Sequence, residues 1–295
     1  MNLTDGEHLL TLGGVRQWVR VDGARHGTVP LVLVHGGPGG NHFVYERTAG
    51  PLLARERTVV YHEQRGCGRS EAPADERAYD VDTLVRDLDE LRVALGAPTV
   101  DLLGYSFGGG LVFAYAHAFP RHVRRVVAQA PALDLQDARF VACQLAGFLE
   151  VAPPEVRARI EGIVASAVPP EVQLERVWGV ASVETVDCFL FHDGRHAGRN
   201  RAWWRESGLV NTGLTHKVVR SRPVLPWEAL AAVDVPTLVV VGRHDRNVGE
   251  AYAREVSEAL PRGRFEVIED AAHFPDVEQP ETYAEVVLRF LARGP

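Results

Sequence analysis

Ser106 lies at the centre of the sequence Gly104-Tyr105-Ser106-Phe107-Gly108, which fits the pattern G-x-S-x-G. The pattern is typical of a nucleophile elbow, in which a serine occupies a strained turn between a strand and a helix. Small neighbours are needed there because the two chain segments cross closely. Since the pattern alone is equally typical of a glycine-rich packing turn, the rest of the chain has to decide between the two interpretations.

Asp245 and His273 have the side-chain types that would activate a serine hydroxyl. A serine is a poor nucleophile unless an imidazole takes its proton, and the imidazole needs a carboxylate to hold its tautomer and stabilise its charge. Taken singly, Asp245 is equally typical of a helix cap and His273 of a surface loop. Together with the elbow, in the order Ser106, Asp245, His273, they predict a catalytic triad.

The backbone N–H groups of Phe107 and Gly37 are the predicted oxyanion hole. Phe107 directly follows the nucleophile, at the start of the predicted helix. Gly37 lies in the glycine-rich run 35–40, which follows the apolar stretch 30–34 and allows the backbone to approach a substrate closely. Loss of one such donor typically lowers the rate by about 10²- to 10³-fold. His35 in the same run is interpreted as structural.

Strand and helix patterns alternate over most of the chain, which favours a right-handed, mostly parallel α/β sheet. The predicted strands lie at two short antiparallel edge segments within 8–21 and at 30–34, 57–62, 99–104, 123–133, 236–242 and 264–268. The predicted helices lie after Asp80 or Asp82 as N-cap, after Ser106, near 249–260 and at 280–293. In parallel sheets, sites gather at the carboxyl ends of the strands, so the three triad candidates can converge there.

The alternation stops between residues 134 and 227, where helical patterns and paired prolines occur without a clear central strand. We expect 134–227 to form a mostly helical cap, or lid, over the carboxyl ends of the strands. Residues 1–133 and 228–295 would then form one core around a shared sheet. Five aromatic residues could line a pocket or hold this cap together, with core packing favoured for most: Phe189, Phe191, Trp203, Trp204 and Trp227.

The composition limits the classes of function. With 46% hydrophobic and 24% charged residues among 295, the chain is typical of a globular protein with a proper core. Its net charge of -7 argues against binding to nucleic acid or anionic membranes. It has no secretion-signal pattern and no run near about 18 apolar residues, so we expect a cytoplasmic location. The three widely spaced cysteines predict neither disulfides nor a metal site.

The chain resembles the α/β-hydrolase superfamily over nearly its whole length, and within it the proline iminopeptidase branch. The resemblance rests on residues 35–39, 63–70, 104–109, 242–245 and His273. It implies an α/β-hydrolase fold with a helical cap and a cofactor-free serine hydrolase. Such an enzyme would cleave a small amide or ester, in a small-molecule or short peptide-like substrate, through an acyl-enzyme intermediate. Nothing in the sequence favours a particular oligomeric state.

One part of the chain departs from this branch, whose members hold the substrate's α-amino group with glutamates. Arg246 follows the predicted catalytic acid, and the late cap contains Leu214-Thr215-His216-Lys217. Because cationic side chains do not bind an ammonium group, the sequence predicts weak amine recognition. Prolyl arylamide should then be a poor substrate, and neutral or anionic acyl groups should be better ones.

Several alternatives remain open at the level of sequence. Amine recognition would be restored if one of three other acids reached the pocket: Glu184, Asp187 or Glu206. The candidate substrate contacts are Trp204, Glu206 and Arg246. A carboxylesterase or lactonase would use the same triad, whereas a ligand-binding protein on the same scaffold would not need turnover. Dehalogenase or epoxide hydrolase chemistry calls for an aspartate nucleophile, and Ser106 argues against both.

Overall fold

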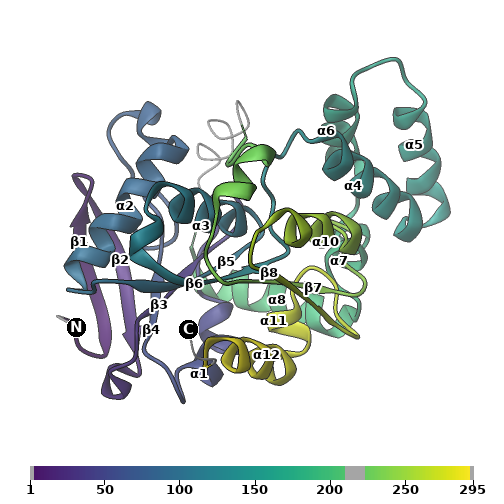
Figure 1. The fold of residues 1–295 in the computed structure, drawn as a ribbon. Helices are drawn as coiled ribbons and strands as arrows, with labels where there is room; N and C mark the ends of the chain where they lie inside the picture. The colour runs from purple at the N-terminus through teal and green to yellow at the C-terminus, as the bar shows by residue number, and fades with distance from the viewer. Residues whose placement is uncertain (1–2, 210–222, 293–295) are drawn as a thin grey trace.

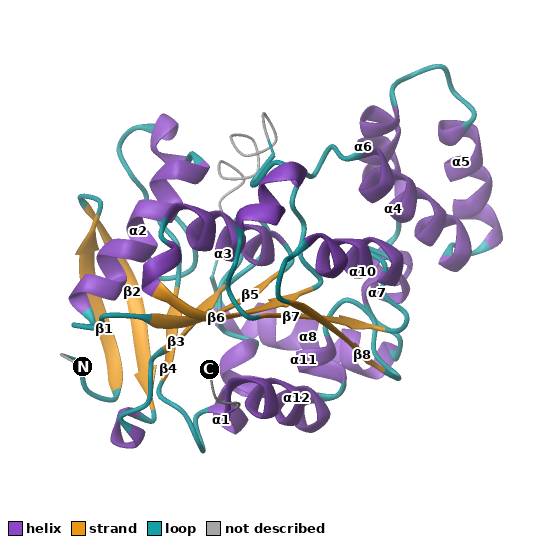
Figure 2. Cartoon of the chain, viewed as in Figure 1, coloured by secondary structure: helices purple, strands orange, loops and turns teal. Residues whose placement is uncertain are grey.

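The computed structural model describes residues 3–209 and 223–292. Its centre is a sheet of eight strands in the order β1-β2-β4-β3-β5-β6-β7-β8. The strands are β1 (Gly6–Leu12), β2 (Val15–Asp22), β3 (Leu31–Val34), β4 (Val59–His62), β5 (Val100–Tyr105), β6 (Val123–Gln129), β7 (Thr237–Gly242) and β8 (Gly263–Ile268). Strand β2 is antiparallel to β1 and β4, and all neighbours from β4 to β8 are parallel (Figure 2).

Helices cover both faces of the sheet, which explains why its central strands are apolar without alternation. On one face lie α2 (Val81–Ala94), α3 (Phe107–Ala118) and α10 (Glu250–Ala259), and on the other lie α1 (Ala49–Leu53), α11 (Pro275–Glu278) and α12 (Pro280–Ala292) (Figure 1). Successive residues of β5 serve the two faces, since Leu102 packs in one apolar core and Leu103 in the other. The prediction of a mostly parallel α/β sheet is confirmed.

The predicted boundaries differ from the observed ones in a few places. Helix α2 begins after Asp80, whose carboxylate accepts the Thr83 N–H at 2.9 Å, so Asp80 rather than Asp82 is its N-cap. Strand β6 ends at Gln129, earlier than predicted, because Ala130 has a φ of 42° that an extended strand does not allow. Within the described residues, no helix has the length and apolar character needed to cross a membrane.

Residues 134–209 contribute five helices: α4 (Ala138–Val151), α5 (Pro154–Val164), α6 (Pro170–Val180), α7 (Val183–Leu190) and α8 (Gly194–Ser207). Helices α4 to α6 project from the core (Figure 1) and, with α7, enclose an apolar cluster in which Phe148 and Phe189 stack at 3.9 Å. Helix α8 instead packs toward α11 through Phe191, Ala197 and Val277. The extent of the predicted cap stays a prediction, because 210–222 lie outside the described residues.

Candidate active site

Ser106 occupies the turn between β5 and α3 with φ 54° and ψ -122°. Its N–H donates to the Gln129 carbonyl at 2.8 Å, and its own carbonyl accepts the Ala132 N–H at 3.0 Å. A side chain on Gly104 would overlap the carbonyl oxygen of Gly108. These contacts hold a backbone conformation that costs roughly 1–3 kcal/mol in a non-glycine residue, which is typical of functional turns.

His273 and Asp245 form a pair at the carboxyl end of the sheet. The Nδ1 atom of His273 lies 3.1 Å from Oδ2 of Asp245, and both side chains are buried. The other oxygen, Oδ1 of Asp245, accepts the N–H groups of Asn247 at 2.7 Å and Val248 at 3.0 Å. Burial opposes the ionisation of Asp245, but His273 and these hydrogen bonds outweigh it, so the pKa of Asp245 is lowered. The carboxylate therefore selects the tautomer of His273 that leaves Nε2 free to accept a proton.

Ser106 and His273 line the same cavity, which has a volume of about 490 Å³. The core contributes Gly37, Tyr105 and Phe274 as well, and we refer to this side as the core wall. The opposite side, the cap wall, consists of Phe140, Gln144, Leu174, Glu175, Trp178 and Leu190. The structure thus brings the predicted nucleophile and base to one surface and pairs the predicted acid with the base.

The predicted oxyanion donors lie at the same place. Phe107 is the first residue of α3, so no helical carbonyl is available to its N–H. Gly37, with φ 124°, lines the cavity. The loop 35–40 runs directly against the nucleophile turn, since a Cβ atom on Gly36 would lie 2.6 Å from the Tyr105 carbonyl oxygen and 2.9 Å from the Ser106 Cβ. The assignment of these two N–H groups as an oxyanion hole stays a prediction.

His35 holds this loop against the neighbouring strand end. Its Nε2 atom accepts the Gln64 N–H at 3.1 Å, and Nε2 of Gln64 donates to the His35 carbonyl at 2.9 Å. The proton therefore lies on Nδ1, which is 3.0 Å from the Gly36 carbonyl. Burial lowers the pKa of His35, so the ring stays neutral. Both ring nitrogens of His35 make hydrogen bonds that hold the loop in place, which agrees with the interpretation of His35 as a structural residue.

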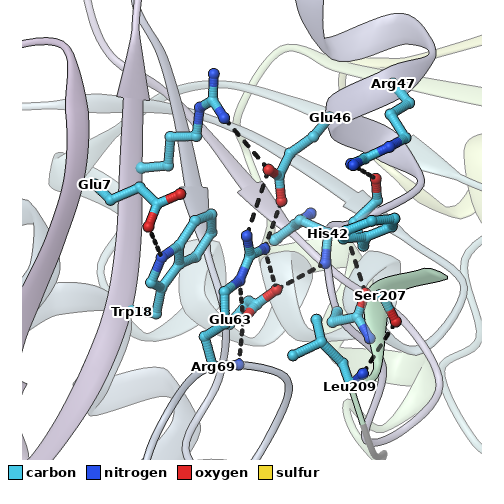
Figure 3. A network of polar contacts seen from close by, with 12 residues as sticks. Glu7, Trp18, His42, Glu46, Arg47, Glu63, Arg69, Ser207 and Leu209 are labelled. Atoms are coloured by element: carbon cyan, nitrogen blue, oxygen red, sulfur yellow. Dashed lines mark hydrogen bonds and ion pairs between the residues drawn. The ribbon is translucent and has the colours of Figure 1, made fainter. Parts of the chain in front are cut away.

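The segment 63–70 braces the far end of the same loop (Figure 3). Arg69 pairs with buried Glu63 at 2.6 Å, contacts Glu46, and stacks over the Trp18 ring at 3.3 Å. Glu63 also accepts the His42 N–H at 3.1 Å. A buried carboxylate is tolerated only when it is paired and hydrogen-bonded in this way. These contacts give the second motif of the resemblance a structural role beside the chain segment that follows the loop 35–40.

Glu278, in α11, connects the cap to the catalytic loop. Its Oε1 atom accepts the N–H groups of His192 and Asp193, both at 2.9 Å, and its Oε2 atom accepts the Ala272 N–H at 2.7 Å. The N–H of His273 itself donates to the Leu190 carbonyl at 3.1 Å. The carboxylate of Glu278 thus joins the segment between α7 and α8 to the loop of His273 through three N–H groups, and one backbone hydrogen bond links His273 to the end of α7.

Two of the three predicted substrate contacts are not among the described residues that line this cavity, and their role in substrate binding stays a prediction. Arg246 turns toward α4, where it pairs with Glu150 at 2.9 Å and donates to the Cys188 carbonyl at 3.3 Å. Glu206 is exposed and contacts Arg47 at 3.3 Å. Both side chains thus have ionic partners outside the lining of the Ser106 cavity. The third, Trp204, lines a smaller neighbouring cavity.

The structure removes part of the basis for the prediction of weak amine recognition, which relied on cationic side chains in the cavity. Arg246 is absent from the cavity lining, while His216 and Lys217 lie outside the described residues. The acids named as possible substitutes do not line the cavity either: Glu184 is exposed and Asp187 pairs with Arg201.

Two functional candidates escaped the sequence analysis. Glu175 lines the large cavity from α6, and Asp276 is a buried acid that lines the smaller one. Nothing local distinguishes Glu175 from other exposed helical acids. Asp276, however, lies between Pro275 and Val277 just after His273. An acid between apolar residues at this place could have been recognised from the sequence as a candidate buried acid. Within residues 3–209 and 223–292, no three His, Cys, Asp or Glu side chains come together as potential metal ligands.

Comparison with known proteins agrees with this architecture. Residues 29–280 match the family described as alpha/beta hydrolase fold. A proline iminopeptidase from Heyndrickxia coagulans is 26% identical over 280 residues, which cover 90% of this chain and 91% of that protein. One from Saccharolobus solfataricus is 25% identical over 276 residues, covering 88% and 84%.

Solved structures give the same result. The proline iminopeptidase-related protein from Thermus thermophilus superposes with a TM-score of 0.80 at 25% identity and covers 98% of both chains. An enol-lactonase from Burkholderia xenovorans shares the fold at a TM-score of 0.69 and 18% identity, covering 97% of this chain and 100% of its own. The chain therefore belongs to the α/β-hydrolase fold family, and within it resembles the proline iminopeptidase branch.

Proposed function

We propose that the protein is a serine hydrolase that transfers the acyl group of a small ester or amide first to Ser106 and then to water. The observation that supports this most strongly is the pairing of His273 with Asp245 on a cavity that Ser106 also lines. Family membership and the proline iminopeptidase relatives support hydrolysis independently of this geometry.

In the proposed mechanism, Nε2 of His273 takes the proton of the Ser106 hydroxyl while its oxygen attacks the substrate carbonyl carbon. The N–H groups of Phe107 and Gly37 stabilise the resulting oxyanion. The C–O or C–N bond to the leaving group then breaks, and His273 returns the proton to that group. Water, activated by the same imidazole, attacks the acyl-Ser106 ester, and its cleavage releases the acid and regenerates the hydroxyl.

The lining of the large cavity supports a mostly apolar substrate. Seven of its residues are hydrophobic or aromatic and carry no charge: Tyr105, Leu135, Phe140, Leu174, Trp178, Leu190 and Phe274. Burial of an apolar acyl or leaving group against them is favourable at about 25 cal/mol per Å². A carboxylesterase or lactonase acting on such a group uses the same steps.

Aminoacyl amides are the second candidate substrate class, because Glu175 lines the cavity. A glutamate on the cap wall supplies the negative partner that a free α-amine needs, and the relatives named proline iminopeptidases give this class a direct precedent. Arg246 does not oppose it, since its charge is paired with Glu150.

Labelling with a fluorophosphonate probe tests the hydrolase proposal. Wild-type protein should be labelled on Ser106, and Ser106→Ala should not. A folded wild-type protein that is not labelled and hydrolyses no ester or arylamide would instead be a ligand-binding protein on this scaffold.

Steady-state kinetics on alanyl and prolyl arylamides and their des-amino analogues separate the substrate classes. Amine recognition predicts that Glu175→Gln lowers kcat/KM about tenfold for aminoacyl substrates only. Glu171→Gln, which changes another acid of α6 outside the cavity lining, is the matched control. Equal values for both variants would assign the enzyme to neutral acyl substrates.

A further inference from the structure

A second cavity, of about 130 Å³, borders the large one and shares Gly37, Tyr105 and Phe274 with it. Its wall includes Asp276 from α11 and Asn41 from the end of the loop 35–40, so we call it the Asp276 cavity. A volume near 130 Å³ has room for several water molecules, and thus for a substituent of a few heavy atoms. Since Gly37 is the predicted oxyanion donor, such a substituent would be attached close to the reacting carbonyl.

Asp276 is the acidic side of this cavity. Its side chain is buried, and Nε2 of Gln129 donates to its Oδ1 atom at 2.6 Å. A carboxylate offers about four lone-pair sites, so this bond and the hydrogen bond with its own backbone N–H use only part of its capacity. Burial raises the pKa of Asp276 to about 6, against the influence of Gln129, which leaves the group ionised at neutral pH. Because the carboxylate of Asp276 is ionised and has lone pairs without a donor among the described residues, it can accept a hydrogen bond from a ligand that enters the cavity.

Asn41 provides the complementary group. Its Oδ1 atom accepts the Phe43 N–H at 3.0 Å, which identifies the other terminal atom as the NH₂ group. This Nδ2 atom is buried and has no hydrogen-bond partner among the residues that the structure describes. A buried donor left without a partner is unfavourable, and Asn41 is one of the residues that line the cavity, so a ligand acceptor that reached Nδ2 would satisfy it.

We propose that the Asp276 cavity binds a small, neutral substrate group that both donates and accepts hydrogen bonds, such as a primary carboxamide or a hydroxyl. The proposal rests on the proposed function, because the group is part of the hydrolysed substrate. An ammonium group cannot accept the N–H of Asn41, and an anion is repelled by Asp276. A carboxamide satisfies both, since its NH₂ donates to Asp276 and its carbonyl accepts from Asn41. Trp204 and Asn200 of α8 complete the wall, so both the cap and the core select this group.

Paired esters of matched shape test this assignment. On the acyl side, para-nitrophenyl succinamate is compared with para-nitrophenyl isocaproate, in which an isopropyl group replaces the carboxamide. On the leaving-group side, the butanoate of glycolamide is compared with isobutyl butanoate. The readout is the ratio of kcat/KM for carboxamide over isopropyl substrate, in wild type and in Asp276→Asn. Dividing the two ratios removes the intrinsic reactivity of each ester.

We expect Asp276→Asn to lower the carboxamide preference about tenfold in one of the two pairs, and Asn41→Ala to lower it in the same pair. Glu281→Gln, which changes an exposed carboxylate at the start of α12, should leave the ratio unchanged. Turnover of both esters with ratios that do not respond to either variant would overturn the proposal and mark the cavity as a site for solvent.

The binding preference is also measured without turnover. In the Ser106→Ala background, calorimetric titration with the same pairs gives a ratio of dissociation constants, and Asp276→Asn should again lower the preference about tenfold. If the wild-type protein hydrolyses none of these esters but this binding preference is observed, the result would count against the hydrolase proposal alone. Equal affinity for both members of each pair would count against the Asp276 cavity.

Discussion

The core wall and the cap wall of the large cavity are built from different kinds of position. On the core wall, Ser106 follows β5 and His273 follows β8, so strand ends bring them together. On the cap wall, Leu174, Glu175 and Trp178 are neighbours on a helix that projects from the core. The proposed reactive groups thus lie where the sheet dictates their positions, whereas the proposed substrate contacts lie where helix packing dictates them.

The two walls also differ in how firmly their residues are held. On the core wall, backbone hydrogen bonds fix the turn at Ser106. The ring of His273 is held by Asp245, whose carboxylate also accepts two backbone N–H groups. Trp178 is 38% exposed and is held by its ring contact with Phe148 and a hydrogen bond to Gln144 at 3.0 Å. This difference predicts that substitutions on the core wall change kcat and that those on the cap wall change KM.

Ser106→Ala should give the largest effect, a loss of about 10⁶-fold in kcat, because the nucleophile itself is removed. His273→Ala should cost nearly as much, since the members of a triad act as a unit. Ester hydrolysis and circular dichroism together check that turnover is lost while the fold is retained. Wild-type turnover in either variant would end the comparison, because the core wall would then not carry the chemistry.

Asp245→Asn should lower kcat by about 10⁴-fold with little change in KM. The amide keeps the shape of the side chain, but it no longer stabilises the imidazolium or selects the Nδ1–H tautomer of His273. Kinetics on one ester across a range of substrate concentration separates the two parameters. A variant affected mainly in KM would place Asp245 among the substrate contacts.

Asp276→Asn should make stability less dependent on pH. Burial raises the pKa of Asp276 to about 6, above the unfolded value near 4, so the folded protein binds this proton more tightly. This favourable contribution is present below pH 4 and is lost as the pH rises to about 6, amounting to about 3 kcal/mol in the free energy of unfolding. Urea unfolding at pH 4.5 and 7.5 tests the sign: the stability of wild type relative to Asp276→Asn should fall with pH. A constant difference would show that the carboxyl is not held in a costly environment.

Trp178→Ala should give the smallest effect, a decrease of about tenfold in kcat/KM that appears mainly in KM. The substitution removes apolar surface from the cap wall without touching the reacting groups. Trp178→Phe, which retains an aromatic ring, should recover most of the loss. If kcat fell while KM stayed constant, the cap wall would take part in the chemistry and the comparison would need revision.

The contrast between the walls also explains how much could be predicted from the sequence. Strand ends are readable because apolar runs identify parallel strands, and this placed Ser106, Asp245 and His273 without any knowledge of side-chain contacts. The direction of Arg246 was not readable, because its partner Glu150 is distant in the sequence and lies in the cap. Glu175 was missed for a related reason: the angle at which α6 meets the core decides which of its exposed residues face the cavity.

Glu278 has a consequence for exchanging caps between relatives. A donor cap joined to this core would have to bring a backbone carbonyl in place of that of Leu190 and two N–H groups in place of those of His192 and Asp193. Without them, the carboxylate of Glu278 and the N–H of His273 would each lose partners beside the proposed catalytic base. An exchange that keeps residues 190–193 of this chain would preserve these hydrogen bonds, although 190–193 lie inside the predicted cap.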